Sequence, residues 1–213
     1  MIYDIKIAQN IAKSLLQINA IILQPRKPFI WASGWKSPIY CDNRKTLSFP
    51  EIRTHIKKSL AKIIINYFND INLIAGVATA GIPHGSLLAE ELNKPFIYTR
   101  SKAKGHGKKN QIEGHFQEGQ SVVLVEDLIS SGKSSIEAAN TLKKSGLKVK
   151  SVISIFTYGF NTAAQNFNKA ELKYISLCDY NTLLTEAIKQ GYIQEADLSI
   201  LKKWRDNPAS WKK

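Results

Sequence analysis

The chain has 213 residues, of which 44% are hydrophobic, and its formal net charge is +13. This size and composition favour one α/β domain with a substantial core over residues 1–213. No apolar run approaches the ~20 residues of a membrane-spanning helix, and the N-terminal residues lack the apolar stretch of a signal peptide. Cys41 and Cys178 are too few for a disulfide framework and too far apart for a metal motif, so we expect a reduced, cytoplasmic protein.

The first third of the chain is predicted to contain two helices joined by a loop-rich segment. Apolar residues at helical spacing predict amphipathic helices over residues 5–16 and 51–67, and a short strand is predicted over 21–23. Between residues 24 and 50, four prolines and a glycine interrupt any regular pattern, which favours loops.

From residue 73 onward, apolar runs alternate with helical patterns. Strands are predicted over 73–77, 95–98, 122–125, 149–156 and 174–178. Helices are predicted over 83–92, 134–144, 181–190 and 194–204. Residues 100–114 are polar and aperiodic, which predicts a long loop of the kind that often acts as a lid. The alternation predicts a parallel sheet with helices on both faces.

One segment places two carboxylates and a run of small residues after a predicted strand. Glu126 and Asp127 follow the apolar run 122–125, and the sequence Ser-Ser-Gly-Lys-Ser-Ser over 130–135 opens the next helix. Open α/β sheets bind ligands at the carboxyl ends of their strands, and a helix N-terminus offers N–H groups to a phosphate. The segment therefore predicts a site for a ligand with sugar hydroxyls and a phosphate.

The same segment ends like a Walker A motif, but it fails the full pattern. Gly132-Lys133-Ser134 would need a glycine five positions before Gly132, where Asp127 stands. A carboxylate there would face the phosphates that a P-loop cradles, which argues against an NTPase. An ordinary strand–loop–helix unit is the other alternative, and two adjacent acids at a strand end argue against it.

The segment resembles the phosphoribosyl-pyrophosphate (PRPP) motif of type I phosphoribosyltransferases. The resemblance extends over about residues 21–156, and two further segments narrow it to orotate phosphoribosyltransferases. It implies a central, mainly parallel sheet flanked by helices, a small N-terminal hood within residues 1–45 and a long flexible loop. It also implies an enzyme that transfers the 5-phosphoribosyl group from PRPP to orotate in UMP synthesis.

The long loop concentrates charge, whereas most other lysines are spread over predicted helices. From Arg100, ten positions hold one arginine, four lysines and a histidine. Alone, such a loop indicates a solvated surface or a nucleic-acid contact. Beside the acidic motif it resembles the family's catalytic loop, in which Arg100, Lys104 and His106 match PRPP-contacting positions. Lys104 and His106 are then the candidates for proton donation to pyrophosphate, whose developing charge the cations neutralise.

Residues 29–44 resemble the family's orotate-site signature: Ser-Gly, then Lys-Ser-Pro, then Tyr-x-Asp-x-Arg. The resemblance implies that Ser33, Gly34 and Lys36 contact orotate, while aromatic residues stack on its ring. The alternative is a hood whose aromatic residues only pack together. Ala32 stands where many members of the family have a lysine.

Two other segments complete the resemblance. Residues 77–85 look like the family's pyrophosphate loop, in which Ala80 replaces a lysine, so backbone donors must bind the anion. Near Tyr158 we find no arginine matching the orotate-binding arginine of some members.

The resemblance also assigns roles inside the motif. Glu126 and Asp127 would bind the ribose hydroxyls, and Asp127 would stabilise the cationic ring in catalysis. Ser130 would contact orotate as well as PRPP. The motif's full set of implied PRPP contacts is Glu126, Asp127, Leu128, Ile129, Ser130, Ser131, Gly132, Lys133 and Ser134.

The resemblance further implies a metal ion and a dimer. Mg²⁺ would be held mainly by the substrate rather than by protein ligands. Homodimers with shared active sites are implied, with no nucleic-acid or membrane partner.

Two rival functions share parts of this pattern. A phosphoribosyltransferase for a purine or for uracil would keep residues 126–135 but should lack the signature in residues 29–44. A PRPP-sensing transcription regulator would need a DNA-binding domain, and the residues before Pro28 are too few for one.

Overall fold

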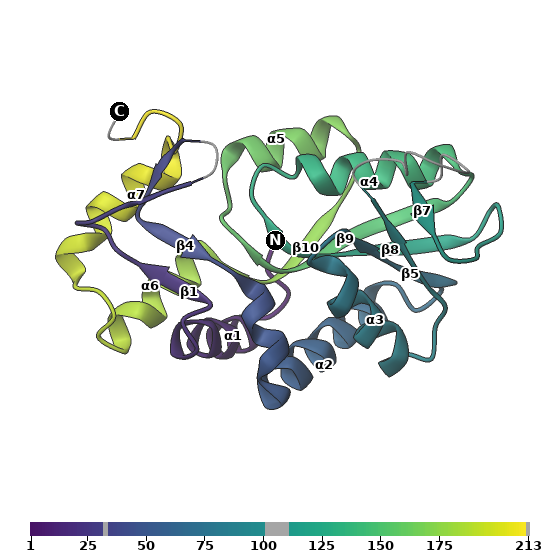
Figure 1. Cartoon of the computed structure of the whole chain (residues 1–213), viewed down its shortest axis with the longest axis horizontal. Helices are drawn as coiled ribbons and strands as arrows, with labels where there is room; N and C mark the ends of the chain where they lie inside the picture. The colour runs from purple at the N-terminus through teal and green to yellow at the C-terminus, as the bar shows by residue number, and fades with distance from the viewer. Residues whose placement is uncertain (32–33, 101–110, 212–213) are drawn as a thin grey trace.

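The computed structural model describes residues 1–31, 34–100 and 111–211. Its centre is a six-stranded sheet in the order β10-β9-β8-β5-β6-β7 (Figure 1). All neighbouring strands are parallel except β6 and β7. The strands are β5 (Leu73–Val77), β6 (Phe96–Thr99), β7 (Ile112–Glu113), β8 (Ser121–Ile129), β9 (Lys148–Thr157) and β10 (Tyr174–Asp179).

Helices cover both faces of the sheet because its strands are apolar on both sides. Along β8, Val123 and Val125 pack into one core, whereas Val122 and Leu124 pack into the other. The first core contains residues of α1 (Ile5–Gln17), α2 (Pro50–Tyr67), α3 (Gly81–Glu91), α6 (Tyr180–Lys189) and α7 (Leu198–Asp206). The second contains residues of α4 (Lys133–Lys144) and α5 (Asn161–Lys169), which lie above the sheet in Figure 1. In the described part of the chain, no helix is both long and apolar enough to cross a membrane.

Short N-terminal strands form a separate layer at one end of the molecule (left in Figure 1). They make two antiparallel pairs, which are β1 (Ile21–Leu23) with β4 (Ile39–Cys41) and β2 (Phe29–Ile30) with β3 (Lys36–Ser37). A 3-10 helix, η1 (Asn43–Ser48), then leads into α2. Trp31 joins this layer to the C-terminal elements, since its ring packs 5.5 Å from Tyr158 and 5.7 Å from Trp204.

The structure confirms the predicted sheet and corrects several elements. β8 continues past residue 125 to Ile129, so both acids lie within the strand, because β9 keeps pairing with it as far as Thr157. The predicted loop over 100–114 contains β7, and the predicted loop region 24–50 contains three short strands. The helix α5 was not predicted, and the helix predicted over 194–204 is η2 (Glu195–Asp197) followed by α7.

Candidate active site

Two adjacent carboxyl groups lie near the carboxyl end of β8, where Glu126 is buried and Asp127 is half-buried. Glu126 is 6% exposed, and its two oxygens accept hydrogen bonds from the Ser135 hydroxyl at 3.3 Å and from the Asp127 backbone N–H at 3.1 Å. Burial raises the pKa of Glu126 well above its ordinary value, and the charge of Asp127 raises it further. Burial also raises the pKa of Asp127. Burial therefore disfavours two negative charges on this pair, and a partner that brings positive charge or donates hydrogen bonds would stabilise its ionised form.

The loop after β8 presents the N-terminus of α4 without a side-chain cap. Gly132 occupies the N-cap position in the left-handed conformation, with φ 77°, and no described side chain caps the helix. The first N–H groups of α4 are therefore open to an anion. Lys133 and Ser134 are exposed in this first turn, whereas Ser130 and Ser131 in the loop are half-buried.

The helix α5 packs against this loop and donates a hydrogen bond to it. The Asn166 side-chain amide donates to the Ser131 carbonyl oxygen at 3.0 Å. A Cβ added to Gly132 would lie 2.5 Å from Cε2 of Phe167, so a larger residue could not occupy this position without displacement. Neither α5 residue was predicted, because their link to the loop spans 35 positions of sequence and follows no spacing rule.

Leu128 and Ile129 complete β8 and turn their side chains into the two cores. The Ile129 carbonyl oxygen accepts hydrogen bonds from the Thr157 hydroxyl at 3.2 Å and from the Tyr158 N–H at 3.1 Å. The side chains of Leu128 and Ile129 therefore cannot contact PRPP. Only the backbone N–H groups of these two residues remain as the predicted contacts.

The turn from β5 to α3 lies directly against the acid-bearing strand. A Cβ added to Gly81, the first residue of α3, would collide with the Val125 carbonyl oxygen and lie 3.5 Å from the Glu126 Cα. No described side chain caps α3, whose N-cap is Ala80, and the peptide bond between Ala78 and Thr79 is cis. The fold therefore brings a second helix N-terminus without a side-chain cap close to the acid pair, where the sequence predicted an anion-binding turn; its Ile82 N–H already donates to the Thr79 carbonyl at 3.3 Å.

The predicted basic loop begins from a β-hairpin. Thr99 pairs with Ile112, and the Arg100 N–H donates to the Gln111 carbonyl at 2.8 Å. The Arg100 guanidinium forms an ion pair with Glu113 at 3.5 Å. Lys104 and His106 lie outside the described residues, so their predicted contacts with PRPP remain predictions.

The N-terminal signature contributes both packing and exposed side chains. Trp31 donates from Nε1 to the Ile39 carbonyl at 3.1 Å and packs, partly buried, against the core, so its part in the aromatic hood is structural. Tyr40 is 40% exposed and packs against Phe29 with ring centroids 5.7 Å apart. Gly34 and Lys36 are exposed, whereas Ser33 lies outside the described residues.

The end of this signature contacts the acid strand directly. Arg44 and Asp42 form a two-point ion pair, with Nε–Oδ1 at 2.6 Å and NH2–Oδ2 at 3.1 Å. Between them, Asn43 is fully buried and donates from Nδ2 to the Asp127 carbonyl at 2.8 Å. Sequence reasoning missed Asn43, because it occupies a variable position of the Tyr-x-Asp-x-Arg pattern.

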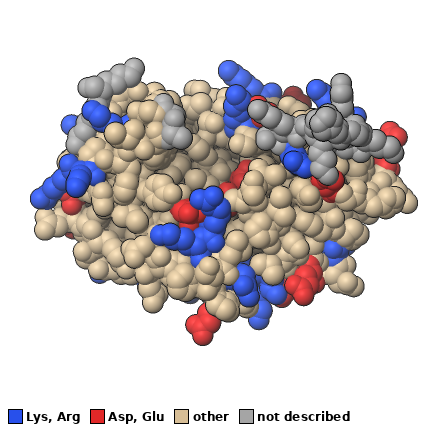
Figure 2. All heavy atoms as spheres, viewed as in Figure 1, with Lys and Arg blue, Asp and Glu red and all other residues tan. Residues whose placement is uncertain are grey.

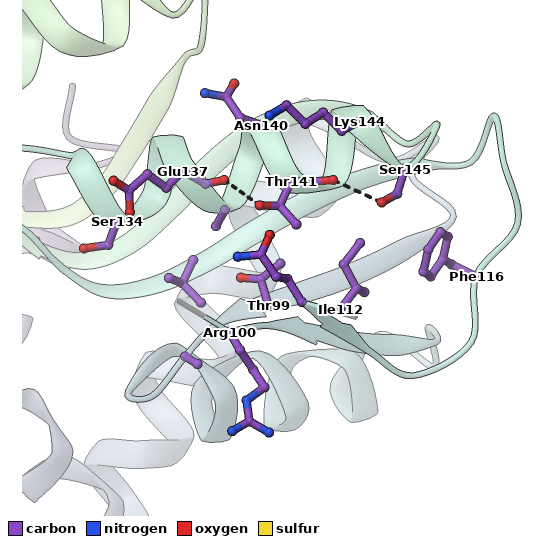
Figure 3. A pocket seen from close by; sticks show the side chains of 14 residues that line it. Thr99, Arg100, Ile112, Phe116, Ser134, Glu137, Asn140, Thr141, Lys144 and Ser145 are labelled. Carbon is purple, nitrogen blue, oxygen red and sulfur yellow. Dashed lines mark hydrogen bonds between the residues drawn. The ribbon is translucent and has the colours of Figure 1, made fainter. Parts of the chain in front are cut away.

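A cavity of about 730 Å³ borders these elements. Figure 3 shows polar side chains of α4 on one side of it, Ile112 and Phe116 on the other, and the Arg100 guanidinium pointing away from α4. Ala78 and Ser134 line its edge, but neither of the two acids is among its described lining residues. The face in Figure 2 is also hollowed near its centre, between the N-terminal strands and the sheet, with charged side chains of both signs at the rim.

Comparison with known proteins identifies the class to which this fold and site belong. Residues 46–183 match the phosphoribosyl transferase domain family. This range contains the acid pair, the loop, the N-termini of α3 and α4, and the stem of the basic loop. The fold and the site therefore define a phosphoribosyltransferase.

Individual relatives narrow the class. The orotate phosphoribosyltransferase of Bacillus subtilis (strain 168) is 54% identical over 202 residues, covering 95% of this chain and 94% of that protein. The crystal structure of orotate phosphoribosyltransferase from Aeropyrum pernix has a TM-score of 0.75 and 27% identity, covering 86% of this chain and 99% of that one. Leishmania donovani UMP synthase has a TM-score of 0.79 and 28% identity, covering 93% of this chain and 42% of that one. This chain belongs to the orotate phosphoribosyltransferase family, and the predicted fold class and family are confirmed.

Proposed function

We propose that this protein transfers the 5-phosphoribosyl group from PRPP to orotate, giving orotidine 5′-phosphate and pyrophosphate in de novo UMP synthesis. The observation that carries the proposal is the pair of the buried Glu126 and the half-buried Asp127, which precedes the uncapped N-terminus of α4 in one strand–loop–helix unit. Carboxylates suit ribose hydroxyls and the free N–H groups suit a phosphate, so the unit fits both halves of phosphoribose.

The acids are proposed to act on the ribose ring. Glu126 and Asp127 would accept hydrogen bonds from its hydroxyl groups. As the bond from C1 to pyrophosphate breaks ahead of attack, positive charge develops on the ring, and the Asp127 carboxylate would stabilise it. The partial burial of Asp127 strengthens that electrostatic effect, since solvent screens charge less there.

The anionic groups of PRPP are proposed to bind at two places. The 5-phosphate would accept hydrogen bonds from the first N–H groups of α4 and from the loop hydroxyls of Ser130 and Ser131. Pyrophosphate would be neutralised by Arg100, Lys104 and His106, the last two of which could supply a proton to it. For Arg100 this requires exchange of its Glu113 partner for the substrate, because the guanidinium now contacts that carboxylate.

The base would lie between Ser130 and the N-terminal layer. We propose that Ser130, Ser33, Gly34 and Lys36 contact orotate, and that residues 1–45 form the hood that covers it. The exposure of Lys36 supports this role, because its ammonium is free to meet the carboxylate of orotate.

Mg²⁺ is proposed as the metal, held chiefly by oxygen atoms of PRPP. The described residues contain no group of three or more His, Cys, Asp or Glu side chains that could hold a metal. The two carboxyl groups on β8 are hard oxygen donors, which fit Mg²⁺ as additional rather than sufficient ligands. When bound, the ion would supply positive charge beside the departing pyrophosphate.

We further propose a homodimer whose basic loop reaches the neighbouring active site, and a cytoplasmic location. The family supports the first proposal, and the two free cysteines, Cys41 and Cys178, fit a reducing compartment.

The proposal is tested by the ultraviolet absorbance of orotate, which should fall when purified protein is mixed with PRPP and Mg²⁺. Uracil, adenine and hypoxanthine serve as alternative bases in matched reactions. Turnover of one of these bases without loss of orotate would show that orotate is not the substrate. It would still agree with the assignment to the phosphoribosyltransferase class.

A further inference from the structure

The side chain of Asn43 connects the N-terminal signature to the acid strand. Asn43 opens η1 and has no exposed surface, and its Nδ2 donates to the Asp127 carbonyl oxygen at 2.8 Å, across 84 positions of sequence. Its side-chain oxygen accepts from the Cys41 thiol at 3.5 Å, and its backbone carbonyl accepts from the Thr46 hydroxyl at 2.6 Å. Both ends of the side-chain amide therefore have a partner where it meets β8.

This hydrogen bond lies where the sheet stops supporting β8 on one side. The strand β5 pairs with β8 only as far as Gly76 opposite Val125. The Asp127 carbonyl lies two residues beyond that last pair, and Asn43 supplies it with a partner. The Asn43 amide therefore donates a hydrogen bond of the kind that a neighbouring strand donates elsewhere in the sheet.

Fixing one carbonyl oxygen also fixes the peptide group that contains it. The peptide unit is planar and trans, so its C=O and its N–H point in opposite directions. The Asn43 bond therefore sets the orientation of the Leu128 N–H and of the adjacent Asp127 Cα, from which the carboxylate projects. That Leu128 N–H is one of the groups that favours the ionised Asp127 carboxylate.

The flanking residues hold Asn43 in place. Asp42 caps η1 by accepting from the Arg44 N–H at 3.3 Å and also receives the Arg44 guanidinium at two points. This ion pair restrains the backbone on both sides of Asn43. The amide and its carbonyl partner are consequently positioned by the fold before any ligand binds.

We propose that Asn43 is a positioning residue for phosphoribosyl transfer, acting through the Asp127 carbonyl to place the Asp127 carboxylate against the ribose ring. The inference rests on the proposed function, in which Asp127 stabilises positive charge on that ring. A displaced carboxylate should weaken transition-state stabilisation more than it weakens binding of orotate, because orotate contacts other groups.

The first test is Asn43→Ala, compared with Asn72→Ala as a matched control. The Asn72 side chain accepts a hydrogen bond from the Ser121 N–H at 2.7 Å, so it anchors the opposite end of the same strand. We expect kcat of Asn43→Ala to fall about 10- to 100-fold, the loss typical of a small misplacement of a reacting group. We expect the KM for orotate to change less than about threefold and Asn72→Ala to keep its kcat. Equal kcat losses in both variants, or no loss in Asn43→Ala, would overturn the inference.

A second variant separates positioning from general stability and remains decisive if Asn43→Ala does not fold. In Asn43→Asp the new side chain can donate to the Asp127 carbonyl only when it is protonated. The ratio of its kcat to that of the wild-type protein should therefore rise as the pH falls from about 8 to about 5. A ratio independent of pH would contradict the inference. Absence of orotate turnover by the wild-type protein itself would instead contradict the proposed function.

Discussion

At the scale of single residues, Gly132 meets two constraints that no other residue type satisfies. Its φ of 77° is unfavourable for side chains with a Cβ, and Phe167 occupies the space into which a Cβ would project. We predict that Gly132→Ala lowers the free energy of unfolding by about 2–4 kcal/mol, from backbone strain and overpacking together. It should also raise the KM for PRPP, because the first turn of α4 shifts. Urea denaturation and initial rates measure the two effects.

Gly191 offers the control for this prediction. Its φ is 75°, and among the described residues no atom lies within 4 Å of a Cβ added to it. Gly191→Ala therefore carries the backbone strain alone, about 1 kcal/mol, and should leave the KM for PRPP unchanged. Equal effects of the two substitutions would contradict the role given to the contact with Phe167.

The buried acid pair predicts how stability depends on pH. Burial raises the pKa of Glu126 above its ordinary value of 4.5. A carboxyl group with a raised folded-state pKa contributes stability that is fully present below its unfolded-state pKa and is lost as the pH rises through the folded-state value. Glutamine does not ionise, so Glu126→Gln should not lose stability as the pH rises. We predict that above the pH at which Glu126 ionises in the folded protein, the variant is more stable than wild type by on the order of 1 kcal/mol.

The same substitution should lower activity, because a carboxylate binds hydroxyl groups more strongly than an amide does. A loss of about tenfold or more in kcat/KM for PRPP corresponds to one charge-assisted hydrogen bond. Chemical denaturation at a series of pH values gives the stability curves. If the curves of the wild-type and Glu126→Gln proteins ran parallel from about pH 4 to 8, the ionisation of Glu126 would not be coupled to folding.

At the scale of elements, α5 supports the motif loop through Asn166. Removing an amide that orients the Ser131 carbonyl should loosen the loop without unfolding the helix. We predict that Asn166→Ala raises the KM for PRPP about three- to tenfold, the equivalent of one lost hydrogen bond, and leaves the KM for orotate unchanged. Asn168→Ala, on the exposed face of the same helix, should change neither value. If Asn166→Ala had the wild-type KM for PRPP, Asn166 would not be needed to hold the loop in the conformation that binds PRPP.

The elements also show why some predictions from sequence succeeded and others failed. Apolar runs such as 122–125 predicted their strands, because a doubly buried strand must be apolar on both sides. β8 was predicted too short, because charged residues usually end a buried strand, whereas Glu126 is here stabilised by Ser135. Helix α5 was missed because only Ala163 and Phe167 are buried among its nine residues, too few to produce a helical pattern.

At the scale of the whole molecule, the sequence predicted the site as separate motifs but not the contacts between them. The order of strands and helices, together with the motif over 126–134, sufficed for the phosphoribosyltransferase class and for the position of the acids, whereas the resemblance to orotate phosphoribosyltransferases also needed residues 29–44 and the basic loop. Long-range links such as Asn43 with Asp127 depend on which side of β8 the N-terminal layer reaches, and no local pattern encodes that. The packing of Gly81 against Val125 likewise became evident only in the fold.

The proposed sharing of active sites between two subunits can be tested with two inactive variants. Lys104→Ala disables the basic loop and Asp127→Asn disables the acid pair, so each homodimer should lose most of its activity. In a mixed dimer, loops that act on the neighbouring subunit would leave one site with both an intact loop and an intact acid pair. Coexpression of the two variants in equal amounts should therefore restore about a quarter of the wild-type activity, because about half of the dimers are mixed and each has one intact site.

Loops that act within their own subunit give the opposite result. Every site of the mixed dimer would then carry one defect, and coexpression would restore no activity. Different affinity tags on the two variants allow the mixed dimer to be isolated, so that low recovery cannot be attributed to poor mixing. An isolated mixed dimer with about half the activity of a wild-type dimer supports exchange of loops between subunits, and an inactive one refutes it.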